Sequence, residues 1–311
     1  MDHLSIRVAC VIPTFNRLGP IKKALAAVTN QTRKPDHIIV VDNHSTDGTV
    51  QWMSAFQAGR NDVTTLFLDN NYGGAGGFYY GMKKAYESGA DWIWVMDDDC
   101  IPDPDALEQL LNCGIITPKS RWKQVGFLAS QVNWTDGTRH RANVPAPARD
   151  WTVGHDRCET CHKIQCATFV SILVNREAIY KVGYPVKEFF IWWDDLEFTY
   201  RVVDAGFSAY YIPASKVIHV TAANRGCADY LDIAKRDIWK YKILSRNRVA
   251  MAFRRTRKHR IVHAVLELGR IYSQMTMQRT PLRLRAAILL PGIKGLFFDY
   301  RKYIVYPGTS N

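Results

Sequence analysis

The sequence predicts an α/β fold with a mostly parallel sheet, helices on both of its faces and a helical region at the C-terminal end. Two observations predict the sheet: short apolar runs typical of strands alternate with helical patterns, and these helical segments are long enough to connect parallel strands. The length of 311 residues suits one large α/β domain with an appendage. Hydrophobic residues make up 47% of the chain and charged residues 23%, which excludes a disordered chain, a fibre and a small disulfide scaffold.

Strands and helices are expected in alternation over the first hundred residues. The expected strands cover residues 8–12, 38–41, 63–68 and 92–96. Between them, one helical pattern places Ile21, Leu25 and Val28 on one face, a second follows the capping sequence at 45–48, and a third begins in the glycine-rich stretch 73–77. Farther along, the apolar pattern predicts a helix that begins at Asp194, two strands at 210–212 and 216–220, and helices at 238–253 and 261–277.

Polar residues follow the C-terminal end of each of the first four strands. They are Thr14, Asn16 and Arg17, then Asp42 and Asn43, then Asn70 and Asn71, and finally Asp97, Asp98 and Asp99. In an open α/β sheet the ligand crevice lies outside these strand ends, so the four loops are expected to meet at one rim. A single polar loop would indicate little, because loops are polar in any protein, but the four together favour a binding site.

Three consecutive aspartates, Asp97–Asp99, follow a tryptophan-rich strand, where uncompensated negative charge is costly. Alternate side chains of an extended chain face the same way, so Asp97 and Asp99 are expected to point together and Asp98 to point apart. Two carboxylates on one side suit Mg²⁺ or Mn²⁺, which bind few carboxylates together with substrate phosphates. The alternatives are a solvated turn or a helix cap by Asp98. The glycine-rich stretch matches neither a Walker motif nor a dinucleotide fingerprint, although it lets an anionic ligand approach the backbone.

A second acidic group, Asp194 and Asp195, follows five bulky apolar residues at the expected start of a helix. Burial raises the pKa of a carboxylate and makes it a plausible proton acceptor near neutral pH. A helix cap is the alternative for Asp194. For His219, at the end of a β-branched run, the alternative to a functional role is a core histidine.

Five motifs in this order resemble the family 2 inverting glycosyltransferases of GT-A fold, most closely the bacterial galactofuranosyltransferases and the related rhamnosyltransferases. The motifs are Val11–Arg17, Val40–Asn43, Asn71 with its glycine run, Asp97–Asp99 with the preceding strand, and Trp193–Asp195. The resemblance covers about residues 6–220. In addition, Arg246-Asn247-Arg248 after Tyr241 resembles an element common just after the catalytic domain of those transferases.

The resemblance implies a role for each candidate residue. The nucleotide sugar would be bound by Thr14, Arg17, Asp42, Asn71, Gly74, Asp97 and Asp98, Mn²⁺ or Mg²⁺ by Asp97, Asp99 and His219, and the acceptor by Trp192, Trp193 and Asp194, with Asp195 as the catalytic base. The two tryptophans would stack on an acceptor sugar, with core packing as the alternative.

The implied reaction is a metal-dependent single displacement that inverts the anomeric centre. The expected donor is UDP-galactofuranose, with dTDP-rhamnose as the alternative, and the acceptor is a glycan or lipid-linked glycan of bacterial cell-surface polysaccharide synthesis. The expected domains are 1–223, the glycosyltransferase domain, and 224–311, a basic helical region. Within the first, residues 1–100 would bind the nucleotide sugar and residues 101–223 the acceptor.

Cysteines and histidines cluster in the expected acceptor half. Cys158, Cys161 and Cys166 with His155 and His162 resemble half of a zinc site, and the alternative is a set of unpaired thiols. The odd count of seven cysteines fits a reducing cytoplasm. The sequence also shows no signal peptide and no uninterrupted apolar run of about 18 residues.

The positive charge of the chain is concentrated at its C-terminal end. Residues 225–311 contain 19 Lys and Arg against 5 Asp and Glu, whereas residues 1–224 contain 22 against 24. Basic helices with apolar faces suit an anionic membrane surface, so residues 235–300 are expected to make a peripheral contact at the inner face of the plasma membrane. The alternative is a solvated or oligomer-forming helical tail.

Three other function classes compete with this interpretation. A nucleic-acid-binding module would use the same basic tail, but the tail carries no recognisable nucleic-acid-binding signature, so no nucleic-acid partner is expected. A nucleotidyltransferase would show a glycine-rich basic signature where this chain has Pro13-Thr14-Phe15. A non-catalytic sugar-binding protein would have little reason to keep Asp97, Asp99 and Asp195 together.

Overall fold

The computed structural model describes residues 6–116, 119–148, 161–226, 229–230, 233, 237–255 and 258–309. The strands are β1 (Val8–Thr14), β2 (His37–Asp42), β3 (Val63–Phe67), β4 (Trp92–Val95), β5 (Cys100–Pro102), β6 (Val125–Asn133), β7 (Ala146–Pro147), β8 (His162–Cys166), β9 (Ile172–Asn175) and β10 (Ser208–His219). The α-helices are α1 (Leu18–Thr29), α2 (Thr49–Gln57), α3 (Gly73–Glu87), α4 (Ala106–Leu111), α5 (Arg176–Val182), α6 (Asp194–Asp204), α7 (Ile238–Arg254), α8 (Arg260–Met277) and α9 (Leu282–Lys294). Short 3₁₀ turns are η1 (Lys119–Gln124), η2 (Arg141–Asn143), η3 (Lys187–Phe189), η5 (Gly295–Phe297) and η6 (Tyr300–Tyr303).

The strands form one sheet in the order β3-β2-β1-β4-β9-β6-β10-β8-β7, with β5 paired to β10. Strands β1 to β4 are all parallel, which confirms the expected βα alternation of the first hundred residues. The second half is mixed, because β9 enters antiparallel between β4 and β6 while β10 runs parallel to β6 and antiparallel to β5 and β8. The sheet is therefore parallel in the half where helical crossovers connect its strands.

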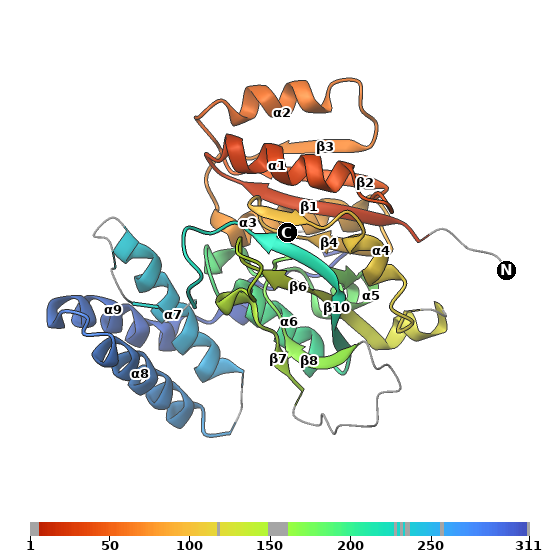
Figure 1. Cartoon of the computed structure of the whole chain (residues 1–311). Coiled ribbons are helices and arrows are strands. Elements are labelled where there is room, and N and C mark those ends of the chain that lie inside the picture. The colour runs from red at the N-terminus through yellow and green to blue at the C-terminus, as the bar shows by residue number, and fades with distance from the viewer. Residues whose placement is uncertain are drawn as a thin grey trace.

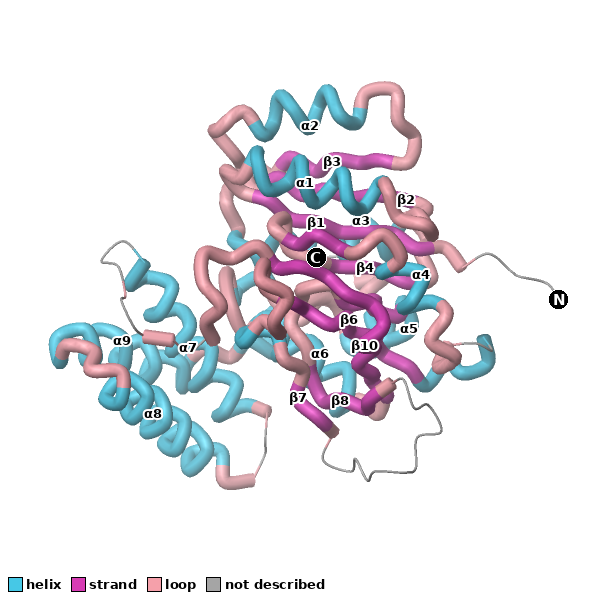
Figure 2. Tube along the Cα trace, viewed as in Figure 1, coloured by secondary structure: helices cyan, strands magenta, loops and turns pink. Residues whose placement is uncertain are grey.

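Helices cover both faces of the sheet (Figures 1 and 2). Alternate side chains of β1 and β4 divide between two cores, as the pleat of a strand requires. Cys10 and Trp94 pack on the face covered by α1, α2 and α4, whereas Val11 and Ile93 pack on the face covered by α3, α5 and α6. Residues Ile21, Leu25 and Val28 of α1 are fully buried, as their helical spacing predicts.

The glycines of α3 allow this helix to approach the sheet closely. A Cβ on Gly81 would overlap the side chain of Val11, and a Cβ on Gly77 would overlap Pro13 and lie 2.8 Å from Asn43 Nδ2. Gly74, in contrast, has no atom within 4 Å of the position of a Cβ. Most of the glycine-rich stretch therefore serves packing, and Gly74 is its member that faces open space.

Two elements differ from expectation. The strands expected at 210–212 and 216–220 form one strand, β10, because the chain stays extended through Pro213 while its pairing with β6 shifts between Ile212 and Lys216. Helix α6 begins at Asp194 as expected, but the spacing of Leu196, Tyr200 and Val203 predicts a different buried face. Phe198 and Val202 fill the core, whereas Tyr200 and Val203 are only half-buried.

Helices α7, α8 and α9 form the C-terminal helical region, at the lower left of Figure 1. Their shared core contains Val249, Ala264, Ile271, Met275 and Ile288, while Ala250 and Met251 on α7 pack with Val186 and Phe189 of the segment before α6. Helix α7 is thus buried on two sides and joins this region to the sheet. None of the described helices is both long and apolar enough to cross a bilayer.

Candidate functional site

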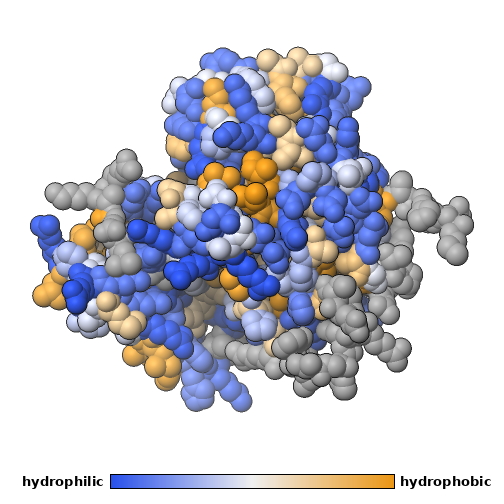
Figure 3. Space-filling model, in the orientation of Figure 1, coloured by the Kyte–Doolittle hydropathy of each residue, from blue (hydrophilic) through white to orange (hydrophobic). Residues whose placement is uncertain are grey.

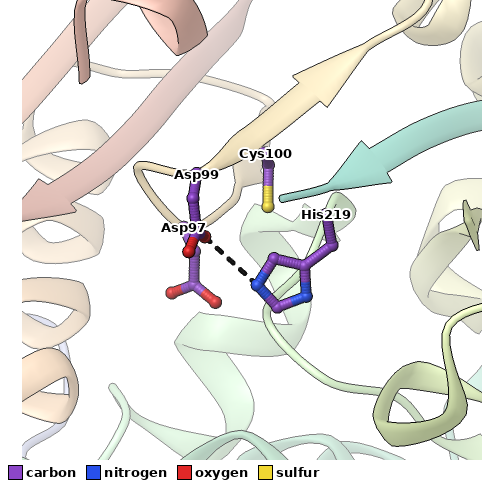
Figure 4. A group of neighbouring side chains, drawn as sticks. All are labelled: Asp97, Asp99, Cys100 and His219. Carbon is purple, nitrogen blue, oxygen red and sulfur yellow. Dashed lines mark ion pairs between the residues drawn. The ribbon is translucent and has the colours of Figure 1, made fainter. Parts of the chain in front are cut away.

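The ends of β4 and β10 bring an acidic loop against a histidine. Strand β5 follows Asp97–Asp99 and pairs antiparallel with β10, so that Cys100 lies opposite His219. One ligand atom from each of Asp97, Asp99, Cys100 and His219 lies within 4.8 Å of all the others. Figure 4 shows the four side chains converging. The three metal ligands predicted from sequence therefore lie together, and Cys100 is an addition that sequence reasoning missed.

The charges in this cluster favour a cation. Burial, followed by the charges of Asp99 and Asp98, raises the pKa of Asp97 well above its usual value. Asp99 Oδ1 is buried and lies 3.1 Å from His219 Nε2. Two carboxylates and an imidazole are suitable ligands for Mn²⁺ or Mg²⁺. The residues present thus fit the expected ion.

His219 is held in place by two residues of the segment 140–143. Its Nδ1 lies 2.9 Å from Asn143 Oδ1, and its Nε2 faces Asp99. The ring of His140 lies 4.7 Å from that of His219, centroid to centroid. Burial and the neighbouring His219 lower the pKa of His140 to about 4, so His140 is neutral at physiological pH. Asn143 and His140 carry no sequence signal because they lie in an irregular segment without a motif.

Asp98 and Asp99 lie in a turn closed by the hydrogen bond from the N–H of Cys100 to the carbonyl oxygen of Asp97 (3.2 Å), so the extended chain expected over Asp97–Asp99 does not form. The carboxylate of Asp98 contacts Thr14 and Arg17. Its Oδ2 accepts a hydrogen bond of 2.6 Å from Thr14 Oγ1, and its Oδ1 lies 2.8 Å from Arg17 Nε. Arg17 Nη2 also pairs with Asp99 Oδ2 at 2.6 Å. Thr14, Arg17 and Asp98, all expected to bind the nucleotide sugar, thus contact one another and connect the ends of β1 and β4.

The remaining expected nucleotide ligands lie at the ends of β2 and β3. Asp42 is 1% exposed; its Oδ2 accepts the backbone N–H of Ser45 at 2.9 Å, while its buried Oδ1 has no hydrogen-bond donor. Asn71 Oδ1 accepts the N–H of Gly73 at 2.8 Å and so shapes the start of α3. A buried carboxylate oxygen without a donor is rare in a folded protein, which makes Asp42 Oδ1 a candidate acceptor for a ligand.

Asp195 lies at the N-terminal end of α6 and lines the same cavity as the acidic cluster. This cavity of ≈ 270 Å³ is lined by Asp97, Asp195, His219 and Trp192, together with His140, Asn143, Thr221 and Tyr241 among others. Asp195 Oδ1 accepts the N–H of Leu196 at 2.7 Å. Burial raises the pKa of Asp195 to about 6. A carboxylate with that pKa can accept a proton near neutral pH.

The three expected acceptor residues have different environments. Trp192 lines the cavity. Trp193 instead packs against the core of Val186, Phe189 and Met251, with the guanidinium of Arg248 5.4 Å from its ring centroid. Asp194 is 5% exposed, and burial, followed by the charge of Asp195, raises the pKa of Asp194 well above its usual value. Of the three, Trp192 is the one placed to meet a ligand in this cavity.

The cysteine cluster differs from expectation. Cys161 is disulfide-bonded, which contradicts the alternative of unpaired thiols at this position and removes Cys161 as a thiolate ligand. Cys166 is a buried free thiol in β8. Of the three other members of the possible zinc site, His162 is the first residue of β8, and His155 and Cys158 lie outside the described residues.

Comparison with known proteins gives three kinds of match. Residues 9–113 match the family described as Glycosyl transferase family 2. The chain is 44% identical over 116 residues to galactofuranosyltransferase GlfT1 of Mycolicibacterium smegmatis, a match that covers 36% of each chain. It is 31% identical over 211 residues to GlfT1 of Mycobacterium tuberculosis, covering 64% of this chain and 65% of that protein. A further relative, N-acetylglucosaminyl-diphospho-decaprenol L-rhamnosyltransferase of Mycobacterium tuberculosis, is 26% identical over 242 residues, covering 67% and 74%.

A solved structure shows the same fold. The crystal structure of GalNAc-T7 with UDP, GalNAc and Mn²⁺ superposes with a TM-score of 0.63 at 12% identity, over 96% of this chain and 57% of that one. This identity is low, so the likeness concerns the fold alone. The matched part of the chain spans only 36% to 65% of the length of the two GlfT1 proteins. Residues 9–113 are thus similar to glycosyl transferase family 2, and the chain has the fold of the GT-A glycosyltransferases.

Proposed function

We propose that this chain is an inverting, metal-dependent glycosyltransferase. The observation that carries the proposal is that Asp97, Asp195 and His219, which come from three separate parts of the chain, line one cavity. A ligand atom of Asp99 lies within 4.8 Å of those of Asp97 and His219. Members of family 2 are glycosyltransferases, and the relatives named above transfer galactofuranose and rhamnose.

Each group has a defined task in the proposed reaction. Asp195 accepts the proton of an acceptor hydroxyl, which then attacks the anomeric carbon from the face opposite the leaving group. Asp97, Asp99 and His219 would hold a divalent ion, which would supply positive charge to stabilise the departing nucleoside diphosphate. Asp42 Oδ1 offers an acceptor to the nucleotide at the end of β2, and Trp192 offers an apolar face to the acceptor sugar. One displacement inverts the anomeric configuration.

The proposed donor is UDP-galactofuranose, supported by the two GlfT1 relatives, and the second candidate is dTDP-rhamnose, supported by the rhamnosyltransferase relative. The test is a panel of sugar nucleotides with Mn²⁺, scored first by thermal stabilisation and then by transfer onto a lipid-linked glycan. UDP-galactofuranose is expected to be transferred with inversion, as read from the anomeric proton couplings of the product. Transfer with retention, or undiminished transfer in EDTA, would contradict the mechanism.

We also propose a peripheral membrane contact through the C-terminal helices. Helix α8 exposes apolar side chains on one side, with Ile261 66% and Val265 61% exposed, and Phe297 beyond α9 is 84% exposed. Figure 3 shows hydrophobic and hydrophilic groups side by side at the lower left, where α8 and α9 lie. Arg260, Arg283 and Lys294 add positive charge nearby, which suits an anionic bilayer.

Co-sedimentation with vesicles containing about one third anionic lipid tests this contact. Val265→Glu is expected to reduce binding, whereas Tyr180→Glu, which adds the same charge at an exposed position of α5, is expected to leave it unchanged. Binding is also expected to weaken with salt. Binding to duplex DNA or to RNA in a gel shift, without binding to vesicles, would instead favour a nucleic-acid partner.

A further inference from the structure

The segment that precedes α6 holds three aromatic residues in a strained backbone conformation. Phe190, Trp192 and Trp193 have φ values of 67°, 60° and 74°. A bulky residue with positive φ is strained and persists only where its surroundings impose the conformation. The same segment presents Trp192 to the cavity and leads directly into Asp194 and Asp195. Some other part of the protein therefore has to hold it.

One side chain of α7 contacts most of this segment. Asn247 is 0% exposed, and its Nδ2 lies 3.1 Å from the carbonyl oxygen of Phe189, 3.1 Å from that of Ile191 and 2.9 Å from that of Trp192. The amide thus donates to carbonyls on both sides of Phe190 and immediately before Trp193. Asn247 is more than 50 residues away in sequence, in the C-terminal helical region.

Arg246 orients this amide and extends its reach. Its Nε and Nη2 donate to Asn247 Oδ1 at 3.0 and 2.8 Å, so the amide nitrogen is turned towards the segment. Arg246 Nη2 also donates to the carbonyl oxygens of Glu188 and Phe189, at 2.9 and 3.1 Å. Two adjacent residues of α7 therefore hold the carbonyls of residues 188, 189, 191 and 192.

The remaining carbonyl, that of Phe190, is held from the opposite side. It accepts the N–H of Ala75 at 3.1 Å, and a Cβ on Gly73 would overlap it. The start of α3, which lies on the proposed donor side, and α7 thus hold the segment between them. Behind α7, a Cβ on Gly295 would overlap the carbonyl oxygen of Arg246, so η5 packs directly against this turn of α7 and restricts its movement.

We propose that Asn247, oriented by Arg246, is a positioning residue that holds residues 189–193 in the strained conformation and thereby places Trp192 and Asp195 for the acceptor. This inference rests on the proposed function, because it assigns those two residues to the acceptor side of the reaction. It gives the C-terminal helical region a role in catalysis: α7 supplies the contacts without which the catalytic segment relaxes.

The test compares Asn247→Asp with Ser245→Ala. The aspartate keeps the shape of the side chain but has no N–H to donate, whereas Ser245 is equally buried on the same helix and its Oγ has no hydrogen-bond partner. Asn247→Asp is expected to lower kcat about 10- to 100-fold and to raise KM for the acceptor, with KM for the donor and affinity for Mn²⁺ unchanged, because a shift of about 1 Å in a reacting group has this effect. Ser245→Ala is expected to behave as the wild type. If the substitution only reduced the fraction of folded protein, the apparent kcat would fall in proportion, and the KM values for donor and acceptor would both stay unchanged.

A second measurement does not depend on turnover. In protein labelled with 5-fluorotryptophan, with the Trp192 and Trp193 resonances assigned by Trp→Phe variants, Asn247→Asp is expected to shift or broaden both signals and Ser245→Ala neither. If Asn247→Asp does not fold, Arg246→Gln provides the same comparison with a smaller effect. Unchanged resonances and an unchanged kcat would overturn the positioning role. Shifted resonances in a protein whose wild type transfers no sugar would leave the positioning role standing and overturn the proposed function.

Discussion

Five carboxylates lie close enough to influence one another at the candidate site. They are Asp97, Asp98, Asp99, Asp194 and Asp195, and the last four all raise the pKa of Asp97. Among the described residues, Arg17 forms ion pairs with two of them, and His219 pairs with Asp99. Like charges this close together are costly without a cation. Arg17 and His219, which pair with the carboxylates, are therefore as informative about the site as the carboxylates themselves.

The pH dependence of turnover should report on Asp195. Its pKa is raised to about 6, and only the deprotonated form accepts a proton, so kcat is expected to fall as the pH falls through about 6 and to level off above it. Asp195→Asn is expected to lower kcat by about 10² to 10⁴ and to abolish this limb of the profile. The measurement is kcat against pH at saturating donor and acceptor.

Stability provides the control for the same substitution. The pKa of Asp195 in the folded state lies above its unfolded value, so its charged form destabilises the fold above about pH 6 and not at low pH. Asp195→Asn is therefore expected to unfold at equal or higher denaturant concentration at pH 8. A variant that loses both stability and activity would indicate a structural role for Asp195 instead.

Asn143 should determine how tightly the ion is bound. Replacing a residue that orients a metal-binding histidine typically lowers metal affinity about 10- to 100-fold, so Asn143→Ala is expected to weaken Mn²⁺ binding by that factor. The measurement is titration calorimetry of Mn²⁺ binding. Asn61→Ala, at an exposed turn before β3, is the matched control. Equal Mn²⁺ affinity in the wild type and Asn143→Ala would show that His219 is not a ligand.

At the scale of elements, the start of α3 serves packing and ligand access at neighbouring positions. Gly77 and Gly81 lie against β1, where a side chain cannot be placed without moving the helix. Gly74 faces open space at the first turn of the same helix, next to Asn71 and the end of β3. The sequence does not distinguish the glycines that pack against β1 from Gly74, because all of them are the same residue type.

Alanine substitutions should separate these two uses. Gly77→Ala is expected to destabilise the protein by about 1–3 kcal/mol, because its Cβ would overlap Pro13. Gly74→Ala is expected to be neutral or slightly stabilising, because alanine favours a helix and meets no neighbour. Chemical denaturation measures both values. If Gly74 borders the donor as the family resemblance implies, Gly74→Ala also weakens nucleotide-sugar binding at unchanged stability; equal stability losses in both variants would refute the distinction.

At the scale of the whole molecule, a buried ion pair connects helices of the C-terminal region. Arg248 Nε on α7 lies 2.6 Å from Glu267 Oε1 on α8, and their side chains are 5% and 12% exposed. Arg248 also donates to Gln274 Oε1 at 3.0 Å. Part of the positive charge of the tail is thus used inside the protein, and only the exposed remainder is available to a membrane or another partner.

Two arginines that share Glu267 should differ in their effect on stability. Arg248→Ala removes the buried guanidinium that pairs with the Glu267 carboxylate. This is expected to lower the free energy of unfolding by about 3–5 kcal/mol. Arg270 pairs with Glu267 Oε2 at 3.2 Å but is 68% exposed, so Arg270→Ala is expected to cost less than about 1 kcal/mol. Denaturant titration followed by circular dichroism measures both. Similar losses of stability in the two variants would show that burial does not determine how much each arginine contributes.

The parallel half of the sheet, the polar residues at its strand ends and their types could be predicted from the sequence. Apolar periodicity and strand-end position are local properties, so β1 to β4 and helix α1 follow from them. Which side chains share a cavity depends instead on the tertiary structure. The approach of Asn143 to His219 joins residues 76 positions apart, and the contacts of Asn247 with the strained segment join residues 55 to 58 positions apart. Trp193 likewise packs in a core that includes Met251 of α7. Such contacts depend on how helices and strands pack together, and no local pattern records them.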